Sequence, residues 1–101
     1  MDFEFDELKR EFLEEAEGKV REIEGLAGKN GGDSERQRAL YLTHQLKGAG
    51  GSYGFTSIST EAASLEAELE SGKIGEAVAS RISRLREVIE TRKAELTPTS
   101  T

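Results

Sequence analysis

The residue best suited to chemistry in this chain is His44, the only histidine among 101 residues that include no cysteine. Lys47 and Gly48 follow His44 by three and four residues, so on a helix all three would share one face. An imidazole that is largely neutral at pH 7 can act as a nucleophile without a dedicated base, and an ammonium group suits phosphoryl oxygens. Together these residues are consistent with a reversible phosphohistidine.

Other chemistries fit the same residues less well. A lone surface histidine is most often inert, and Lys47 alone is an ordinary solvated lysine. One histidine without a second histidine or a cysteine at ligand spacing makes a poor transition-metal site, so we expect no metal and no cofactor of the chain's own. No Ser-His-acid arrangement is evident from spacing, which disfavours acyl transfer. A helical interaction module in which His44 is incidental stays open as a function of a different class.

Four amphipathic helices are expected to position these residues. Apolar residues recur at steps of three and four, and glycine-rich or proline-containing segments separate the periodic stretches. The predicted helices span residues 5–27, 34–52, 57–71 and 74–96, and a frayed tail follows at 97–101. No alternating apolar run indicates a strand. Four helices with short connections pack most simply as an all-α, antiparallel up-down-up-down bundle.

The apolar residues of each helix predict the core. The first helix is expected to bury Phe5, Leu8, Phe12, Ala16, Val20, Ile23 and Ala27. The third and fourth are expected to bury Ile58, Ala62, Leu65 and Leu69, and Ile74, Val78, Ile82, Leu85, Ile89 and Leu96. Ser34 with Gln37 matches a capping box for the second helix, and either Thr56 or Ser57 could cap the third.

His44 is predicted to face solvent. At about 100° per residue, the core stripe of the second helix lies opposite His44. That stripe consists of Ala39, Leu42, Leu46, Ala49 and Tyr53. The residues that share the side of His44 are Gln37, Leu40, Tyr41, Lys47, Gly48 and Gly51. Leu40 and Tyr41 either pack on a neighbouring helix or contact a partner.

Gly48 has a cost that calls for a compensating role. Glycine inside a helix is less favourable than alanine by about 0.5–1 kcal/mol. Gly48 lies one turn from His44 on the same face, so its missing Cβ leaves room beside the ring, and Gly51 extends that clearing. The two glycines therefore predict that another protein approaches the imidazole closely.

Length and charge narrow the class of protein. A chain of 101 residues allows one domain with one modest core, so residues 1–101 are expected to form a single unit. The net charge of −6 disfavours nucleic-acid binding. No apolar run is long enough to span a membrane and the first residues do not resemble a signal peptide, so we expect no membrane association and a cytoplasmic location.

The chain resembles the histidine-containing phosphotransfer (HPt) domains of two-component phosphorelays. The family's pattern His-x-Leu-Lys-Gly, with a further glycine six residues after the lysine-glycine pair, is matched by His44, Leu46, Lys47, Gly48 and Gly54. The run from His44 to Phe55 and the segment Ala62-Ala63-Ser64-Leu65-Glu66 also resemble the family. The similarity is specific over about a quarter of the chain.

This resemblance implies a phosphoryl carrier rather than an enzyme. His44 would be phosphorylated on its outer ring nitrogen, Lys47 would stabilise the phosphoryl group, and Gly48 would make room for the partner. The partner would be a receiver domain of a response regulator or hybrid histidine kinase, which brings the aspartate and the magnesium. The interface would be small and transient, with Leu40 and Tyr41 at its apolar centre, and the chain would be a monomer.

Two further expectations concern the partner. The cations Arg36, Arg38 and Lys47 suggest a weakly basic docking face that complements an acidic receiver pocket. A chemotaxis-type histidine kinase carries a similar His-x-x-Lys-Gly helix in its phosphate-accepting N-terminal domain, and this is the alternative within the same chemistry. The direction of phosphoryl flow and the identity of the partners do not follow from the sequence.

Overall fold

Four helices make up the regular structure of the described residues. The computed structural model describes residues 3–28, 32–72 and 75–96. They form α1 (Phe3–Gly28), α2 (Asp33–Ser52), α3 (Thr56–Glu70) and α4 (Glu76–Leu96), and no strand occurs within those ranges. The all-α prediction is confirmed, and the helix ends agree to within two residues. The predicted start of the fourth helix at Ile74 and the tail 97–101 lie outside the described residues.

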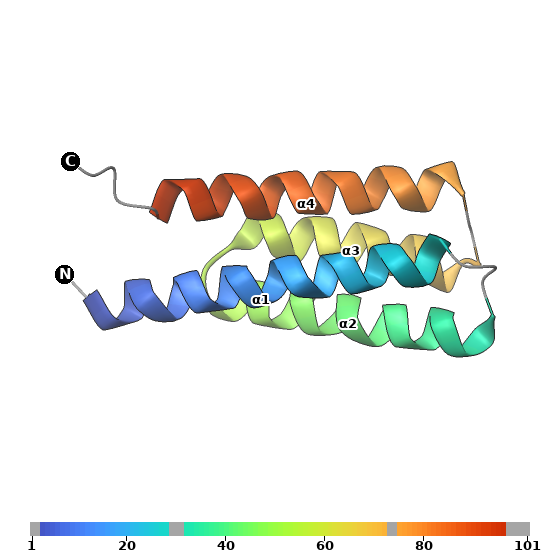
Figure 1. Ribbon diagram of the computed structural model, residues 1–101, viewed down its shortest axis with the longest axis horizontal. Coiled ribbons are helices and arrows are strands. Elements are labelled where there is room, and N and C mark those ends of the chain that lie inside the picture. The colour runs from blue at the N-terminus through green and yellow to red at the C-terminus, as the bar shows by residue number, and fades with distance from the viewer. Residues whose placement is uncertain (1–2, 29–31, 73–74, 97–101) are drawn as a thin grey trace.

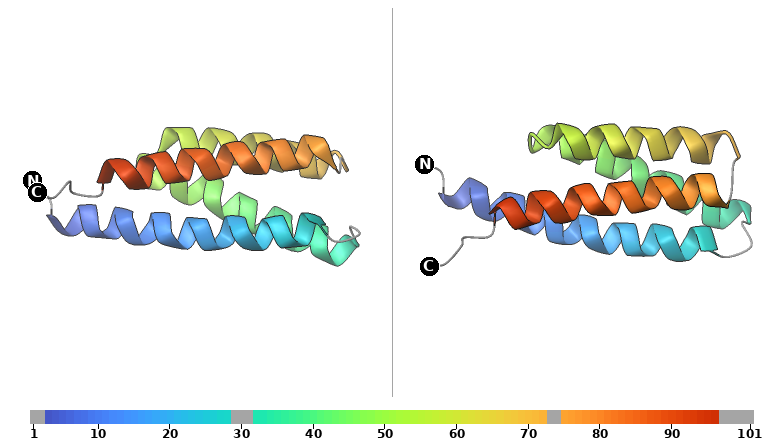
Figure 2. Two further views of the ribbon diagram at one scale, coloured as in Figure 1. Left: turned by 45° about the horizontal axis from the view of Figure 1, so that its top comes forward. Right: turned by 90° about the horizontal axis from the view of Figure 1, so that it is seen from above.

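The helices lie lengthwise beside one another around a shared core (Figure 1). Each helix packs against two others, in the ring order α1, α2, α3, α4. Two further views show the same elongated body, whose principal extents are 45 × 23 × 18 Å (Figure 2). Helix α2 therefore has α1 on one side and α3 on the other. Within the described ranges, no helix is both long and apolar enough to cross a bilayer.

The buried side chains follow the predicted stripes on α2, α3 and α4. All four of the residues predicted on α3 are buried, and so are Val78, Ile82, Leu85 and Ile89 on α4. On α2, Ala39, Leu42 and Leu46 are buried, whereas Ala49 and Tyr53 are partly buried against the core. The stripe opposite His44 is thus the face that α2 turns to its neighbours.

The prediction for α1 was wrong at both ends. Phe5 and Leu8 are 39% and 48% exposed, and Ala27 is exposed, whereas the buried residues include Leu13, which the stripe omitted. Figure 1 gives the reason for the N-terminal error, since the first turns of α1 extend past the ends of α2 and α3. Phe5 stacks on Tyr53, the residue after α2, but Phe5 and Leu8 both stay largely exposed, so their periodicity does not lead to burial.

Both capping predictions were also wrong. Helix α2 begins at Asp33 after Gly32, and α3 begins at Thr56 after Phe55, and neither of these N-cap residues makes a side-chain cap. The connection between α2 and α3 is closed by backbone bonds instead. Phe55 N donates to Gly50 O at 2.7 Å, and Gly54 has φ +83°, a conformation that favours glycine. This tight turn returns α3 directly alongside α2.

Candidate functional site

His44 lies near the middle of the 20-residue helix α2, on the side away from the core. Its side chain is 68% exposed, which agrees with the predicted orientation. Because the helix is anchored by the buried residues Leu42 and Leu46 on its other side, the backbone that carries His44 is held in place. The imidazole is therefore presented to solvent from a fixed position.

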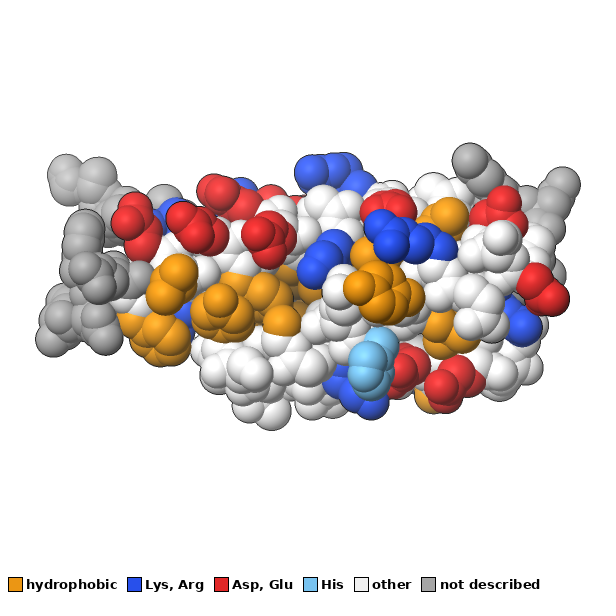
Figure 3. Space-filling model, turned by 90° about the horizontal axis from the view of Figure 1, so that it is seen from below, with side chains coloured by type: hydrophobic (Ala, Val, Ile, Leu, Met, Phe, Trp, Pro, Cys, Tyr) orange, Lys and Arg blue, Asp and Glu red, His pale blue; other side chains and the backbone are white. Residues whose placement is uncertain are grey.

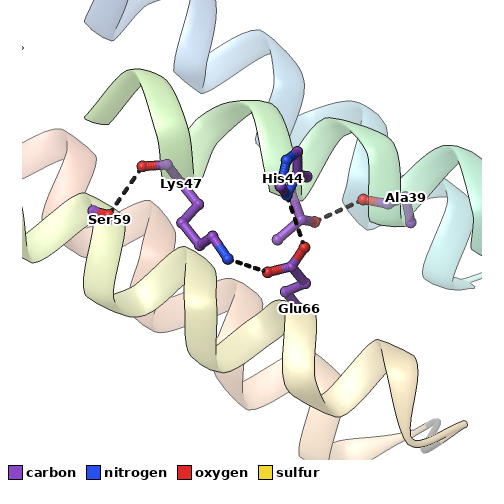
Figure 4. A network of polar contacts seen from close by, with 6 residues as sticks. Ala39, His44, Lys47, Ser59 and Glu66 are labelled. Atoms are coloured by element: carbon purple, nitrogen blue, oxygen red, sulfur yellow. Dashed lines mark hydrogen bonds and ion pairs between the residues drawn. The ribbon is translucent and has the colours of Figure 1, made fainter. Parts of the chain in front are cut away.

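A carboxylate of α3 joins His44 to Lys47 (Figure 4). Glu66 Oε2 lies 3.1 Å from His44 Nδ1, and Glu66 Oε1 accepts a hydrogen bond from Lys47 Nζ at 2.9 Å. The side chain of Glu66 is only 14% exposed, so it lies in the crevice between the two helices. Sequence reasoning included Glu66 in the family resemblance and did not identify it as a site residue.

The charges of this group support one another. The hydrogen bond from Lys47 lowers the pKa of Glu66, an effect that burial opposes and that His44 reinforces. The same bond raises the pKa of Lys47. Glu66 is therefore ionised at neutral pH, and an ionised carboxylate can only accept hydrogen bonds. It follows that Nδ1 of a neutral His44 carries the proton, and the lone pair lies on Nε2.

Gly50 and Ser59 set the distance between α2 and α3, and sequence reasoning missed both. A Cβ at Gly50 would lie 3.2 Å from Ile58 Cγ2 and 3.2 Å from the backbone nitrogen of Ser59, so the helices meet closely at this glycine. The hydroxyl of Ser59 donates to Lys47 O at 2.9 Å. These contacts fix the side of α3 that bears Glu66 against the side of α2 that bears His44 and Lys47.

Gly48 and Gly51 are exposed on the face of α2 that carries His44. A Cβ at Gly48 would meet no atom within 4 Å, and one at Gly51 would meet only Ser59 Oγ at 3.9 Å. Neither glycine is therefore required by a contact within the described part of the chain. The space beside Gly48 is open, and its role in clearing an approach to His44 stays a prediction.

The remaining predicted docking residues differ in exposure. Gln37 is exposed and Tyr41 is 54% exposed, whereas Leu40 is partly buried and packs against the core. The Tyr41 hydroxyl accepts a hydrogen bond from Gln45 Nε2 at 2.9 Å, and the Arg38 guanidinium lies 5.7 Å from the Tyr41 ring centroid. Tyr41 is thus an exposed ring held from two sides, and Leu40 offers only part of its surface.

The expected basic docking face is largely neutralised. Arg36 lies 3.6 Å from Asp33, and Lys47 is paired with Glu66. Arg38 Nε lies 2.9 Å from Glu22 Oε2 on α1. Each cation that suggested a weakly basic face therefore has an acidic neighbour, and the basic docking face stays a prediction.

The surroundings of His44 were also compared with a metal site and with the cavity of the bundle. Among the described residues, no three histidine, cysteine, aspartate or glutamate side chains are grouped so that they could hold a metal ion. A cavity of about 630 Å³ lies between helix ends and is lined by residues such as Leu26, Leu69 and Val78, with none of the residues of the histidine site. The site is an open surface suited to another macromolecule.

These features define a class: a four-helix protein that presents one histidine, oriented by a carboxylate, on an open helix face. The family model for the Hpt domain matches residues 7–95, and the chain belongs to that family. Hpt domains are phosphocarrier modules that take part in histidine phosphotransfer with the receiver domains and kinases of phosphorelays. No curated protein and no solved structure matches the chain in the same comparisons.

Proposed function

We propose that this chain is a phosphoryl carrier that accepts phosphate on His44 from a receiver-domain aspartate and passes it to another receiver. The observation that carries the proposal is the contact of Glu66 with His44 Nδ1, because it leaves the other ring nitrogen, Nε2, available in solvent beside Gly48. An oriented nucleophile on an open surface is what transfer between two proteins requires.

The transfer step follows from this orientation. The Nε2 lone pair attacks the phosphorus of an aspartyl phosphate, an N–P bond forms, and the O–P bond to the aspartate breaks. The departing aspartate takes the electron pair of that bond as a carboxylate. The ring keeps its proton on Nδ1 and becomes a phosphorylated imidazolium, which the Glu66 carboxylate stabilises through the same hydrogen bond. Transfer to the next receiver reverses these steps.

Lys47 is proposed to stabilise the phosphoryl group. Its ammonium has three N–H donors, and Glu66 accepts one of them at 2.9 Å. Lys47 lies one turn after His44, so its remaining donors can reach oxygens bonded to phosphorus on Nε2. Glu66 therefore has two proposed roles, since it orients the nucleophile and keeps the cation close to it.

The partner side of the proposal rests on the open face. The receiver would contact the exposed part of Leu40 and four further residues of this face: Gln37, Tyr41, Gly48 and Gly51. The receiver would supply the aspartate and hold the magnesium ion that neutralises charge during transfer. An antiparallel up-down-up-down order of the helices, a monomeric state and a cytoplasmic location are further parts of the proposal.

Incubation with a phosphorylated receiver domain tests the proposal. We expect acid-labile, base-stable label on the wild-type chain and none on the His44→Gln variant. Parallel incubation with a chemotaxis-type kinase core and ATP distinguishes the alternative, because direct labelling by the kinase alone would indicate a kinase's phosphate-accepting domain. If neither donor labels the wild-type chain, the interaction-module reading replaces the carrier.

A further inference from the structure

All four helices contribute to the cavity at one end of the bundle. The ends of α1 and α3 and the starts of α2 and α4 lie together there, at the opposite end from the two chain termini (Figure 1). The volume of this cavity, about 630 Å³, falls within the range of about 300–1,000 Å³ that is usual for small-molecule sites. We call it the end cavity. Its size is therefore sufficient for a small organic molecule.

Apolar side chains form much of the lining of the end cavity. Those that belong to the core or pack on it are Leu26 of α1, Ala39 of α2, Leu69 of α3, and Val78 and Ile82 of α4. Water beside such side chains finds few hydrogen-bond partners, and an apolar cavity of only about 150 Å³ engineered in another protein binds benzene. The lining therefore favours an occupant with an apolar body.

The charged side chains that line the end cavity are mainly acidic. One guanidinium, that of Arg36, is accompanied by four carboxylates, those of Glu24, Asp33, Glu35 and Glu76. Glu24 is paired with Arg86, and Asp33 lies 3.6 Å from Arg36. Within the described part of the chain, Glu35 and Glu76 take part in no ion pair.

The excess of negative charge determines which head group fits. Figure 3 shows acidic side chains at this end of the molecule, while the histidine lies nearer its middle. A cationic group beside Glu35 and Glu76 would complement carboxylates that lack a partner, whereas an anionic group would be repelled. The charges at the end cavity therefore favour an occupant with a positive charge.

We propose that the end cavity is a binding site for a small apolar molecule that carries one amino group. The hydrocarbon body would contact side chains such as Leu69 and Ile82, and the ammonium group would lie near Glu35 and Glu76. No residue of the histidine site lines the end cavity. This inference is therefore independent of the proposed carrier function, and its tests use no receiver domain.

Titration with three probes that share one skeleton tests the proposal. The probes are phenylbutylamine, phenylbutanol and phenylbutanoate, and binding is followed through the methyl NMR signals of Leu26, Leu69, Val78 and Ile82. We expect saturable shifts of these signals. The amine should bind roughly two- to five-fold more tightly than the alcohol, which is the range expected for an exposed ion pair. The carboxylate should bind most weakly of the three.

Ala79→Phe tests the place of binding. Ala79 is an exposed residue of α4 that lines the end cavity, so a ring there should occupy space that the probe needs. We expect the dissociation constant of the amine to rise about ten-fold or more. The matched control is Ala77→Phe, the same change at an exposed position of α4 that does not line the cavity, and it should leave the dissociation constant unchanged.

The double variant Glu35→Gln/Glu76→Gln tests the charge. We expect it to remove the preference for the amine over the alcohol while both still bind. Its control, Glu14→Gln/Glu87→Gln, loses the same charge at exposed positions that do not line the end cavity, and it should keep the preference. Circular dichroism establishes that each variant is folded before its titration.

Three results would overturn the proposal. The first is the lack of a saturable shift with any probe up to about 10 mM, a concentration at which small molecules of this size saturate a well-fitting site. The second is an amine that binds no more tightly than the carboxylate. The third is an equal effect of Ala79→Phe and Ala77→Phe, which would place the probe elsewhere. Labelling of His44 by a receiver would be unaffected by any of these results.

Discussion

At the scale of single residues, Glu66 decides which nitrogen of His44 can react. A neutral imidazole has two tautomers, and a carboxylate at Nδ1 favours the one with its proton on that atom. Oε2 of Glu66 lies 3.1 Å from Nδ1, and its Oε1 is held by Lys47. One carboxylate therefore fixes the tautomer, the ring orientation and the position of the neighbouring cation.

Replacing Glu66 with glutamine tests this role. An amide can either donate to or accept from Nδ1, so the variant no longer selects one tautomer, and it also loses the charge that holds Lys47. We expect the rate of transfer to fall about ten-fold or more, as is common when the group that orients a functional histidine is removed. Nitrogen chemical shifts of the His44 ring should report a mixed tautomer population alongside the slower transfer.

Glu61→Gln on the same helix is the control for that variant. Glu61 is 17% exposed on its side chain and lies 3.6 Å from Arg84, with no contact to His44. The Glu61→Gln variant therefore removes one negative charge from a side chain that is similarly buried on the same helix and that has a cationic neighbour. If both variants slow transfer equally, a general effect on α3 explains the loss and Glu66 has no special role.

His44, Lys47 and Gly48 could be predicted because they lie on one helix, where spacing alone determines which residues share a face. Glu66 could not be predicted in the same way. The contact between Glu66 and His44 depends on the position and rotation of α3 relative to α2. The apolar periodicity of each helix gives no information about how the two helices are placed relative to one another. The close contact at Gly50 and the bond from Ser59 to Lys47 O set it.

At the scale of elements, two glycines of α2 that look alike in the sequence serve different purposes. Gly48 faces open space, whereas Gly50 faces Ile58 and the backbone of Ser59. Gly48 affects how closely a partner can approach from outside. Gly50 determines how closely α2 and α3 pack, so substitutions at the two positions should have opposite effects on stability.

Gly48→Ala should stabilise the protein and weaken its function. The new Cβ meets nothing within 4 Å, so the higher helix propensity of alanine should raise the free energy of unfolding by about 0.5–1 kcal/mol. The methyl group narrows the approach to His44, so transfer should slow. Urea denaturation and transfer rates measure the two effects, and a faster transfer would contradict the clearance role.

Gly50→Ala should destabilise the protein. Its Cβ would lie 3.2 Å from the Ser59 backbone nitrogen, which belongs to a helix and cannot move aside alone. Overpacking of this kind costs about 1–3 kcal/mol, more than the propensity gain. We expect a lower midpoint in urea denaturation, with a smaller contribution of Glu66 to transfer because α3 shifts away. An unchanged midpoint would show that α2 and α3 can move apart enough to accommodate the methyl group without a loss of stability.

At the scale of the whole molecule, the sequence predicted four helices and most of the core, since stripes on α2, α3 and α4 are covered by neighbours. The prediction of buried residues failed where burial depends on the relative lengths of the helices. Phe5 and Leu8 continue the stripe of α1 into turns that extend past the ends of α2 and α3, and no periodicity reveals where a neighbouring helix stops.

The stability of the bundle should depend on pH through Glu66 and Lys47. The pKa of Glu66 is lowered from its ordinary 4.5, so its contribution is fully present above about pH 4.5 and is lost as the pH falls through the lowered value. The pKa of Lys47 is raised from 10.5, so its contribution is fully present below that pH and is lost as the pH rises through the raised value.

Urea denaturation of the wild type and Glu66→Gln between pH 3 and pH 8 measures the acidic limb. We expect wild type to be more stable at neutral pH and the difference to shrink as the pH falls below about 4.5. If the difference in stability between wild type and Glu66→Gln stays constant down to pH 3, or grows, the ionised carboxylate of Glu66 does not stabilise the protein through its ion pair with Lys47.

The place of His44 near the middle of a regular helix has a consequence for association. Fixing the backbone of a residue costs roughly 1–2 kcal/mol of conformational entropy, and folding of α2 has already met that cost for His44 and its neighbours. A partner that binds this face orders a few exposed side chains here and no backbone. Any backbone entropy lost on forming the complex, and any slow step of loop ordering, therefore belongs to the partner.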